Sequence, residues 1–298
     1  MIDQILNPER EAVESALMRL LPVDAWPERL HRAMAHAVFA GGKRVRPILA
    51  RLANRAAGSD PDTITEAACG LELIHTYSLI HDDLPAFDDD VLRRGKPTVH
   101  VAFDEATAIL AGDALLTEGL LVLARFPVGP VWAVRRADAV ELVAEAVSAR
   151  GMVGGQMEDL EATGQVESRE VDPRLRLDRI HRAKTGCLLA ASVELGAVLA
   201  GVSDDDRKKF ADFGAGLGLA FQIADDILDA TGTAQDLGKS PGKDAESGKL
   251  TYVTLYGLEN ARRRLADLEE RLVGQAAEIE GEDGDLAAIA RYVARRRS

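Results

Sequence analysis

The chain has 298 residues, of which 47% are hydrophobic and only 4% aromatic, and its formal net charge is −13. That length is enough to bury a large core, and abundant Ala, Leu, Glu and Arg favour helices over strands. A nucleic-acid-binding protein is normally basic, so the acidic balance argues against that class.

The same sequence indicates a compartment. Cys69 and Cys187 lie in apolar surroundings and offer no disulfide framework, which predicts a reducing, cytoplasmic location. The first ten residues lack the basic start and apolar run of a signal peptide. The longest apolar stretch, residues 187–202, contains Glu194 and is shorter than the ~20 residues that a membrane span needs. We therefore expect a buried core helix there and no membrane span.

Helical periodicity dominates the whole chain, and no alternation typical of strands persists. Breaks rich in Gly and Pro separate the periodic segments, and Asp60 and Ser203 stand where helix N-caps are expected. The pattern predicts one all-α domain over residues 1–298, built from roughly ten or more helices. The predicted helices are 5–21, 27–39, 44–57, 62–84, 102–125, 134–163, 174–200, 204–231, 249–276 and 284–297.

The first candidate site is the stretch GGKRVRP at residues 41–47. Two glycines free the backbone just before a helix, and Lys43, Arg44 and Arg46 follow. Basic residues in a first helical turn oppose the helix dipole, which is unfavourable unless they serve a purpose. The stretch is therefore interpreted as a diphosphate clamp at a helix N-terminus. The alternative is a basic first turn without a ligand.

The second candidate site is the acidic stretch HDDLPAFDDDVLRRGKPTVH at residues 81–100. His75, Ser78 and Asp82 share one helical stripe, but Asp88 would lie ~240° around a straight helix from Asp82. Because Pro85 cannot continue an undisturbed helix, we expect the chain to leave the helix near Leu84 and to bring Asp88 back toward Asp82. A solvated acidic helix end is the alternative to a cation site.

Small residues mark two further places. Gly151, Gly154 and Gly155, and the GAGLG run at residues 214–218, indicate close helix packing, because no strand precedes the GAGLG run as a dinucleotide loop requires. In HRAKTGC, at residues 181–187, Gly186 weakens the helix and the Thr185 hydroxyl can bond back to the carbonyl of His181. A loosened turn there could direct carbonyl oxygens toward a pocket.

The acidic stretch has a partner in FQIADDILD, residues 221–229. Asp225 and Asp229 lie ~40° apart on one helical face, with Gln222 one turn earlier. Two carboxylates among apolar neighbours repel each other, and a divalent cation would reverse that repulsion. Magnesium prefers one or two carboxylates together with substrate phosphates. Acidic clusters beside bases thus predict a magnesium–phosphate site, to which Lys239, Lys243 and Lys249 of the following Gly-rich loop could contribute.

In all these elements the chain resembles the polyprenyl synthetase family of trans-isoprenyl diphosphate synthases. The motifs GGKRVRP, the acidic stretch, AGDALL, GGQMEDL, AKTG, FQIADDILD and GKLT stand in the family's order across nearly the whole chain. The resemblance implies a single helical bundle of the isoprenoid synthase type around a central cavity, usually as a homodimer. It also implies head-to-tail condensation of an allylic diphosphate with isopentenyl diphosphate, and no nucleic-acid partner.

The resemblance further assigns roles to residues of this sequence. An allylic diphosphate would bind through three magnesium ions, an isopentenyl diphosphate would bind beside it, and dipoles would face an allylic cation. The implied metal ligands are Asp82, Asp83, Asp88, Asp225 and Asp229; the allylic diphosphate contacts are Arg93, Lys184, Lys239 and Lys249; the isopentenyl diphosphate contacts are Lys43, Arg46, His75 and Arg94; and the groups facing the cation are the Lys184 carbonyl, Thr185 and Gln222.

Product length is also implied by resemblance. Tyr77 stands five residues before Asp82, and an aromatic residue at that place goes with a fifteen-carbon product, which is farnesyl diphosphate. A helical wheel places Tyr77 ~140° from Asp82, so spacing alone does not direct it into a tunnel. The alternatives are a geranylgeranyl diphosphate synthase, a terpene cyclase or head-to-head synthase, and a non-catalytic magnesium-binding subunit. The GGKRVRP motif argues against a cyclase, and the presence of both aspartate motifs argues against a non-catalytic subunit.

Overall fold

The structure is a computed structural model that describes residues 2–167, 172–231 and 250–296. Nearly all of its elements are helical, which confirms the predicted all-α class. In chain order they are α1 (Ile2–Leu20), α2 (Glu28–Val38), α3 (Val45–Ala56), η1 (Pro61–Ile64), α4 (Thr65–Asp82), β1 (Leu92–Arg93), β2 (Lys96–Pro97), α5 (Val99–Ala102), α6 (Glu105–Arg125), η2 (Pro130–Trp132), α7 (Ala133–Val147), α8 (Met152–Ala162), α9 (Pro173–Ile180), η3 (His181–Gly186), α10 (Cys187–Ala200), α11 (Asp204–Thr231), α14 (Tyr252–Tyr256), α15 (Leu258–Glu280) and α16 (Asp285–Arg295).

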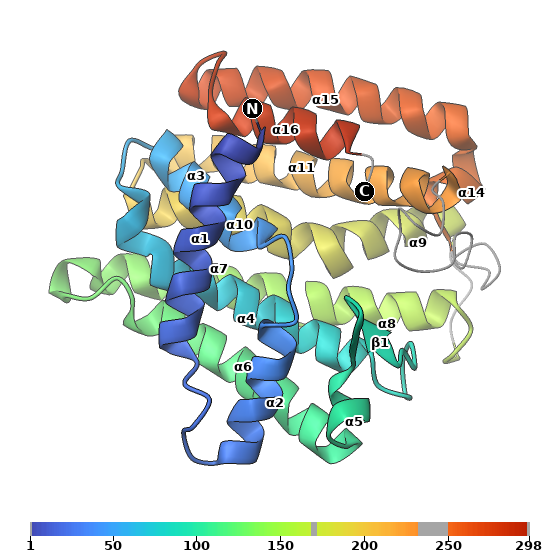
Figure 1. Ribbon diagram of the computed structural model, residues 1–298. Coiled ribbons are helices and arrows are strands. Elements are labelled where there is room, and N and C mark those ends of the chain that lie inside the picture. Colours follow the sequence, from blue (N-terminus) through green and yellow to red (C-terminus); the bar gives the residue numbers. More distant parts are fainter. Residues whose placement is uncertain (1, 168–171, 232–249, 297–298) are drawn as a thin grey trace.

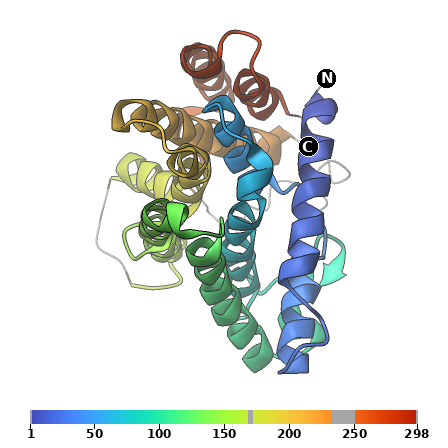
Figure 2. The same cartoon turned by 90° about the vertical axis from the view of Figure 1, so that its left-hand side faces the viewer.

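The helices stack in layers. α15, α16 and α11 lie along the top of the bundle, α10 lies below them, and α4 and α6 lie in the lower part (Figure 1). α4 packs along α6, and α10 packs against both α11 and α3. The view turned by 90° shows α1 running along one side of these layers (Figure 2).

Two apolar clusters hold the layers together. One surrounds α4 and α6 and includes the fully buried Leu71 and Leu115, and the other surrounds α10, α11 and α15 and includes Phe213 and Leu272. A cavity lies where the two clusters meet: Tyr77 of the first cluster lines it, and so does Phe221, which packs against the second.

The helix boundaries follow the predictions closely, with three breaks that periodicity did not show. The predicted helix 134–163 is divided between α7 and α8, where the Ser148 hydroxyl accepts the backbone N–H of Arg150. The predicted helix 249–276 is interrupted at Gly257, whose φ of 80° favours glycine. The predicted helix 102–125 begins instead at Glu105, because the Asp104 side chain caps it by accepting the Thr107 N–H at 2.7 Å.

Other local predictions are confirmed. Asp60 accepts the N–H of Asp62, and Ser203 accepts the N–H of Asp206, so both act as caps. The GAGLG run lies inside α11, where a side chain added at Gly218 would meet Gly186 at 3.0 Å. Close packing, and not a dinucleotide loop, therefore accounts for that run.

Two helical stretches in the described part of the chain are long and apolar enough to cross a membrane: Glu105–Arg125 and Pro173–Ala200. α10 packs between α3 and α11, whereas α6 packs along α4 with one face and leaves Ile109 and Leu110 exposed on another. Core helices of proteins that do not enter a membrane can be equally long and apolar, so the expected absence of a membrane span stays a prediction.

Candidate active site

The acidic loop after α4 doubles back on the helix. α4 ends at Asp82, and the backbone N–H of Asp88 donates to the Asp82 carbonyl at 2.9 Å. The Asp89 N–H donates to the Leu84 carbonyl in the same turn. The chain therefore leaves the helix where Pro85 predicted, and Asp88 returns to the neighbourhood of Asp82.

The next carboxylate, Asp83, points elsewhere. Its side chain is only 5% exposed, and its Oδ1 accepts a hydrogen bond from Arg93 Nε at 2.7 Å, with Nη2 of the same guanidinium 2.5 Å away in an ion pair. Arg93 lies on β1 of the short antiparallel hairpin, where it pairs with Lys96. Asp83 thus fixes Arg93 beside the acidic loop, and it is not among the residues that line the main cavity.

The main cavity has a volume of about 470 Å³ and lies between α4, α8, the η3 turn and α11. Asp82 enters it from α4 and Asp225 enters it from α11. The structure thus brings together two motifs that lie far apart in sequence, as the cation hypothesis requires. The other predicted site residues on its walls are Arg46, His75, Tyr77, Lys184, Thr185 and Gln222.

The cavity destabilises the ionised form of the Asp82 carboxylate. Burial raises its pKa to about 6, the Lys184 ammonium opposes that shift, and the Asp88 carboxylate adds to it. Lys184 is itself held by Asp159 of α8, whose Oδ2 accepts its ammonium at 2.7 Å. Since the protein's own cations only partly offset the cost of charge on Asp82, the site favours an additional cation.

The turn that carries Lys184 and Thr185 is a π-helix, His181–Gly186, inserted between α9 and α10. π-Turns occur mostly inside longer helices and often at functional sites. The loosened turn that Gly186 predicted is therefore present. Gly155 on α8 faces it so closely that any side chain there would overlap the backbone of Lys184.

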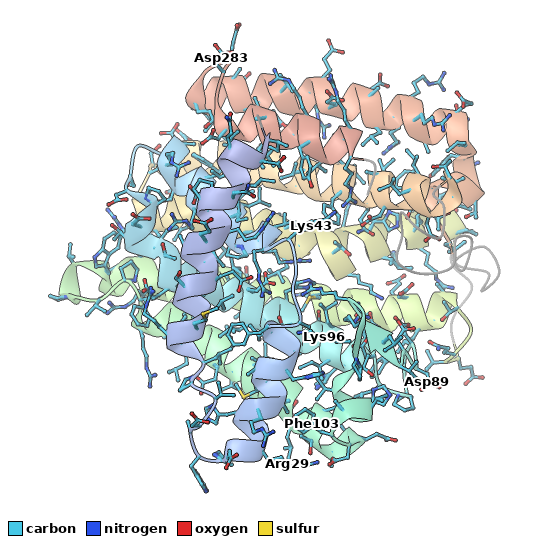
Figure 3. All side chains as sticks on the ribbon, in the orientation of Figure 1. Arg29, Lys43, Asp89, Lys96, Phe103 and Asp283 are labelled. Carbon is cyan, nitrogen blue, oxygen red and sulfur yellow. The ribbon has the colours of Figure 1, made fainter. Side chains whose placement is uncertain are left out.

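The GGKRVRP stretch lines a second, open cleft of about 480 Å³, which shares Arg46, His75 and Phe221 with the main cavity. Arg94 reaches across from the hairpin and donates to the Gly41 carbonyl. Gly42 has a φ of 144°, so the backbone there favours glycine, and a side chain at that position would also displace the Arg94 guanidinium, which lies 2.6 Å from where it would begin. Lys43 lies on the face shown in Figure 3, away from the acidic loop that carries Asp89.

Burial perturbs two groups in this cleft. It lowers the pKa of Arg46 to about 10, an effect that Glu72 opposes and Arg94 increases, and the Nε of Arg46 has no hydrogen-bond partner. Burial, followed by the charges of Arg46 and Arg94, holds the pKa of His75 well below its usual 6.5. The imidazole is therefore neutral at physiological pH, and the cleft carries an excess of positive charge that an anion would relieve.

Arg44, which the sequence analysis grouped with Lys43 and Arg46, has a different environment from those two residues. The residue adopts a left-handed conformation with φ 52° just before α3, and its side chain is 1% exposed. The guanidinium donates to Glu14 at 2.7 Å, to Glu72 at 2.8 Å and to the Val38 carbonyl at 2.7 Å. Arg44 therefore ties α1 and α4 to the start of α3, because a change of backbone conformation turned it away from its neighbours Lys43 and Arg46.

Sequence reasoning gave Arg296 no firm role. The structure places its guanidinium 2.6 Å from Oδ1 of Asp225, with its side chain 6% exposed. The only sequence signal was the basic run ARRRS at the end of the chain. Asp229 lies one turn after Asp225 on α11, and Lys239 and Lys249 lie outside the described residues.

The donor set fits magnesium better than a metal held by protein alone. Among the residues that the structure describes, no three His, Cys, Asp or Glu side chains gather closely enough to form a site by themselves. Magnesium characteristically uses one or two carboxylates, water and substrate phosphates. Two carboxylates that line one cavity from different helices, with bases nearby, match that requirement.

Comparison with known proteins agrees with this geometry. The family described as polyprenyl synthetase matches residues 27–288. The chain is 42% identical over 295 residues to a farnesyl diphosphate synthase of Geobacillus stearothermophilus, covering 99% of this chain and 98% of that one. It is 43% identical to the large subunit 1 of a heterodimeric geranylgeranyl pyrophosphate synthase of Arabidopsis thaliana, covering 97% and 77%.

Solved structures show the same likeness. The crystal structure of an FPP/GFPP synthase from Zymomonas mobilis, in its apo form, matches with a TM-score of 0.84 and 33% identity, over 99% of this chain and all of that one. The crystal structure of a geranyltransferase from Legionella pneumophila matches with a TM-score of 0.83 and 33% identity, over 100% and 97%.

Proposed function

Because the chain belongs to the polyprenyl synthetase family, we propose that it is a farnesyl diphosphate synthase that condenses geranyl diphosphate with isopentenyl diphosphate. Dimethylallyl diphosphate would serve as the shorter allylic substrate. The observation that carries the proposal is the cavity that Asp82 and Asp225 enter from opposite helices, adjoined by the basic cleft of Lys43, Arg46 and Arg94. One pocket suits a metal-bound diphosphate, and the other suits a diphosphate held by bases.

Three magnesium ions would be held by aspartates of the two motifs. Asp82 and Asp225, which line the cavity, would be the principal ligands. Asp88, tied to the Asp82 carbonyl, and Asp229, one turn after Asp225 on α11, would assist them. Asp83 fits a different task in this proposal, since its carboxylate already holds Arg93. Bound magnesium would neutralise the charge of the allylic diphosphate and so make it a better leaving group.

The side chains around the metal site would then hold and release the diphosphate. Arg93 and Lys184 lie next to Asp82 and would contact the phosphate oxygens, together with Lys239 and Lys249. As the carbon–oxygen bond of the allylic diphosphate breaks, positive charge develops on the allylic carbon. Thr185 and Gln222 line the same cavity, and their fixed dipoles, with the Lys184 carbonyl, would stabilise that charge.

The second substrate would bind in the basic cleft, through Lys43, Arg46 and Arg94, with neutral His75 at the boundary of the two pockets. Its double bond would attack the allylic carbon, forming the new carbon–carbon bond. The departed diphosphate would accept the proton that is then lost. The apolar walls formed by Met152, Met157 and Leu160 would exclude water, which would otherwise quench the cation.

Product length distinguishes the proposal from its nearest alternative, a geranylgeranyl diphosphate synthase, which the Arabidopsis relatives keep open. Tyr77 lines the cavity, is 6% exposed, and packs edge-on against His81 with ring centroids 5.7 Å apart. A bulky ring beneath Asp82 leaves room for a shorter chain. This supports a fifteen-carbon product.

The test is an assay of purified protein with magnesium, geranyl diphosphate and isotope-labelled isopentenyl diphosphate. The expected product is labelled farnesyl diphosphate, identified by mass spectrometry. A predominant twenty-carbon product would establish the geranylgeranyl alternative. A product without label would indicate a cyclase, and absence of diphosphate release would indicate a non-catalytic subunit.

We also propose a cytoplasmic homodimer. Val101, Ile109 and Leu110 on α5 and α6 are 45–58% exposed, and such apolar residues gathered on one pair of helices suit a protein interface. Light scattering after size exclusion should give about twice the mass of the chain, and Leu110→Glu should reduce it to the mass of the monomer. A monomeric wild type would contradict this part of the proposal.

A further inference from the structure

The end of the chain is built into the candidate site through Arg296. Helix α16 stops at Arg295, and Arg296 adopts an extended conformation (φ −59°, ψ 147°) that turns its side chain inward. The guanidinium lies 3.8 Å from the centre of the Phe221 ring and donates to the Phe221 carbonyl at 2.8 Å. Both anchors are on α11, one turn before Asp225.

The neighbouring arginine shows that this placement is specific. Arg295 is 71% exposed and pairs with Glu269 of α15 on the surface. Arg296, one residue later, is 6% exposed and contacts Oδ1 of Asp225 at 2.6 Å. Two adjacent residues of the same type thus have opposite environments.

The contact on Asp225 is one that a metal ion would need. A guanidinium is a permanent cation that donates hydrogen bonds to carboxylates and offers no lone pair to a metal. While it holds Oδ1, that oxygen is already neutralised. Asp225 itself is 48% exposed, so a cation can still approach from the cavity.

Resting on the proposed metal site, we propose that Arg296 is a latch that occupies the place of a divalent cation on Asp225 until metal displaces it. Lys43 lies close enough to Arg296 and Asp225 to interact with the charge of each. Burial and the Arg296 charge lower the pKa of Lys43, whereas the Asp225 charge raises it. When a metal ion takes Asp225, Arg296 loses its counter-ion beside Lys43. Metal loading would thereby expose additional positive charge at the mouth of the diphosphate cleft.

The direct test is the affinity of the substrate-free protein for Mn²⁺, measured from the electron paramagnetic resonance signal of the free ion. Arg296→Gln should bind Mn²⁺ about fivefold more tightly than wild type, the effect expected for loss of one partly screened ion pair. The matched control is Arg295→Gln, which removes the same charge one residue away and should leave the affinity unchanged. Equal affinities of wild type and Arg296→Gln, or equal gains in both variants, would overturn the latch.

A second measurement needs no substitution. Phenylglyoxal labels accessible arginines, and peptide mass spectrometry can separate Arg295 from Arg296. Labelling of Arg296 should be low without metal and should rise at saturating Mg²⁺, whereas Arg295 should label equally in both. Labelling of Arg296 that ignores Mg²⁺ would refute the inference.

Failure of the latch and failure of the metal site give different results. If wild type binds Mn²⁺ and Asp225→Asn binds it much more weakly, the metal site stands whatever Arg296 does. If wild type, Asp225→Asn and Arg296→Gln all bind Mn²⁺ with the same weak affinity, then Asp225 holds no cation in the substrate-free protein and the latch is wrong. The proposed metal site is then tested separately by the product assay, in which the substrate diphosphate is present.

Discussion

Replacing Tyr77 by Ala tests whether the cavity floor sets the length of the product. The ring lies 6% exposed between the first apolar cluster and the cavity, packed against His81. Removing the Tyr77 ring would enlarge the cavity by the volume of an aromatic side chain. We therefore expect the main product to lengthen from fifteen to twenty carbons, because the growing chain can extend past residue 77.

The same change has a calculable cost. Truncating a buried aromatic residue to Ala destabilises a protein by about 3–5 kcal/mol, and the lower end applies where the new space adjoins a cavity. About 3 kcal/mol corresponds to a fall in melting temperature of about 5 °C for a chain of this size. Thermal unfolding followed by circular dichroism gives that shift, and it also sets a temperature at which the variant is folded for the product assay.

The control is Tyr77→Phe, which keeps the ring and removes only the hydroxyl. It should make the same product as wild type. If Tyr77→Ala remains folded and still releases only a fifteen-carbon product, then the ring does not limit the chain, and the reasoning from its position is wrong.

Three further predictions concern the charged groups. Asp82→Ala and Asp225→Ala should each lower turnover by at least about 100-fold with circular dichroism unchanged, since each removes a principal cation ligand; near-normal turnover would contradict the assignment. Lys43→Met should raise KM for isopentenyl diphosphate with little change in stability. Arg44→Met should instead lower the free energy of urea unfolding by about 3 kcal/mol, because it removes the partner of the buried Glu72 carboxylate. Equal effects of the two variants on KM and on stability would refute this division of roles. Because burial lowers the pKa of His75 in the folded protein, the unfolded state binds the proton first as the pH falls. The free energy of unfolding should therefore decrease as the pH drops below about 6.5. A His75→Gln variant should show a weaker dependence of the unfolding free energy on pH.

Most of the helices could be predicted from the sequence, because the buried face of a helix recurs every turn and places apolar residues at that spacing. The sequence also predicted that Asp225 and Asp229 share a face and that Pro85 ends a helix, since these are local geometric facts. What it missed was decided by a single backbone angle or by distant partners. In the sequence Arg44 resembles its basic neighbours, but its left-handed φ directs its side chain into the core. The break at residues 148–151 depends on a hydrogen bond to the Ser148 hydroxyl in an otherwise helical pattern.

Tertiary partners explain the remaining differences. Residue type and helical spacing did not separate Asp83 from Asp82, because the two carboxylates are adjacent at the end of α4. The difference depends on how the hairpin folds back: its Arg93 binds Asp83, whereas Asp82 lines the cavity. Likewise the run ARRRS gave no reason to separate Arg295 from Arg296, whose environments depend on Glu269 and Asp225.

One buried carboxylate explains how the basic cleft exists without a ligand. Glu72 is 2% exposed on α4 and pairs with Arg44 at 2.8 Å, and its charge also stabilises the charged forms of Arg46 and Arg94. Glu14 also pairs with Arg44 at 2.7 Å, but Glu72 and Asp83 act on Arg46 and Arg94 only at longer range, so the cleft retains an excess of positive charge. Arg46 contributes to that excess, because its Nε has no hydrogen-bond partner. Glu72 therefore lets the arginines gather in the folded protein, and its insufficiency leaves them able to bind a diphosphate.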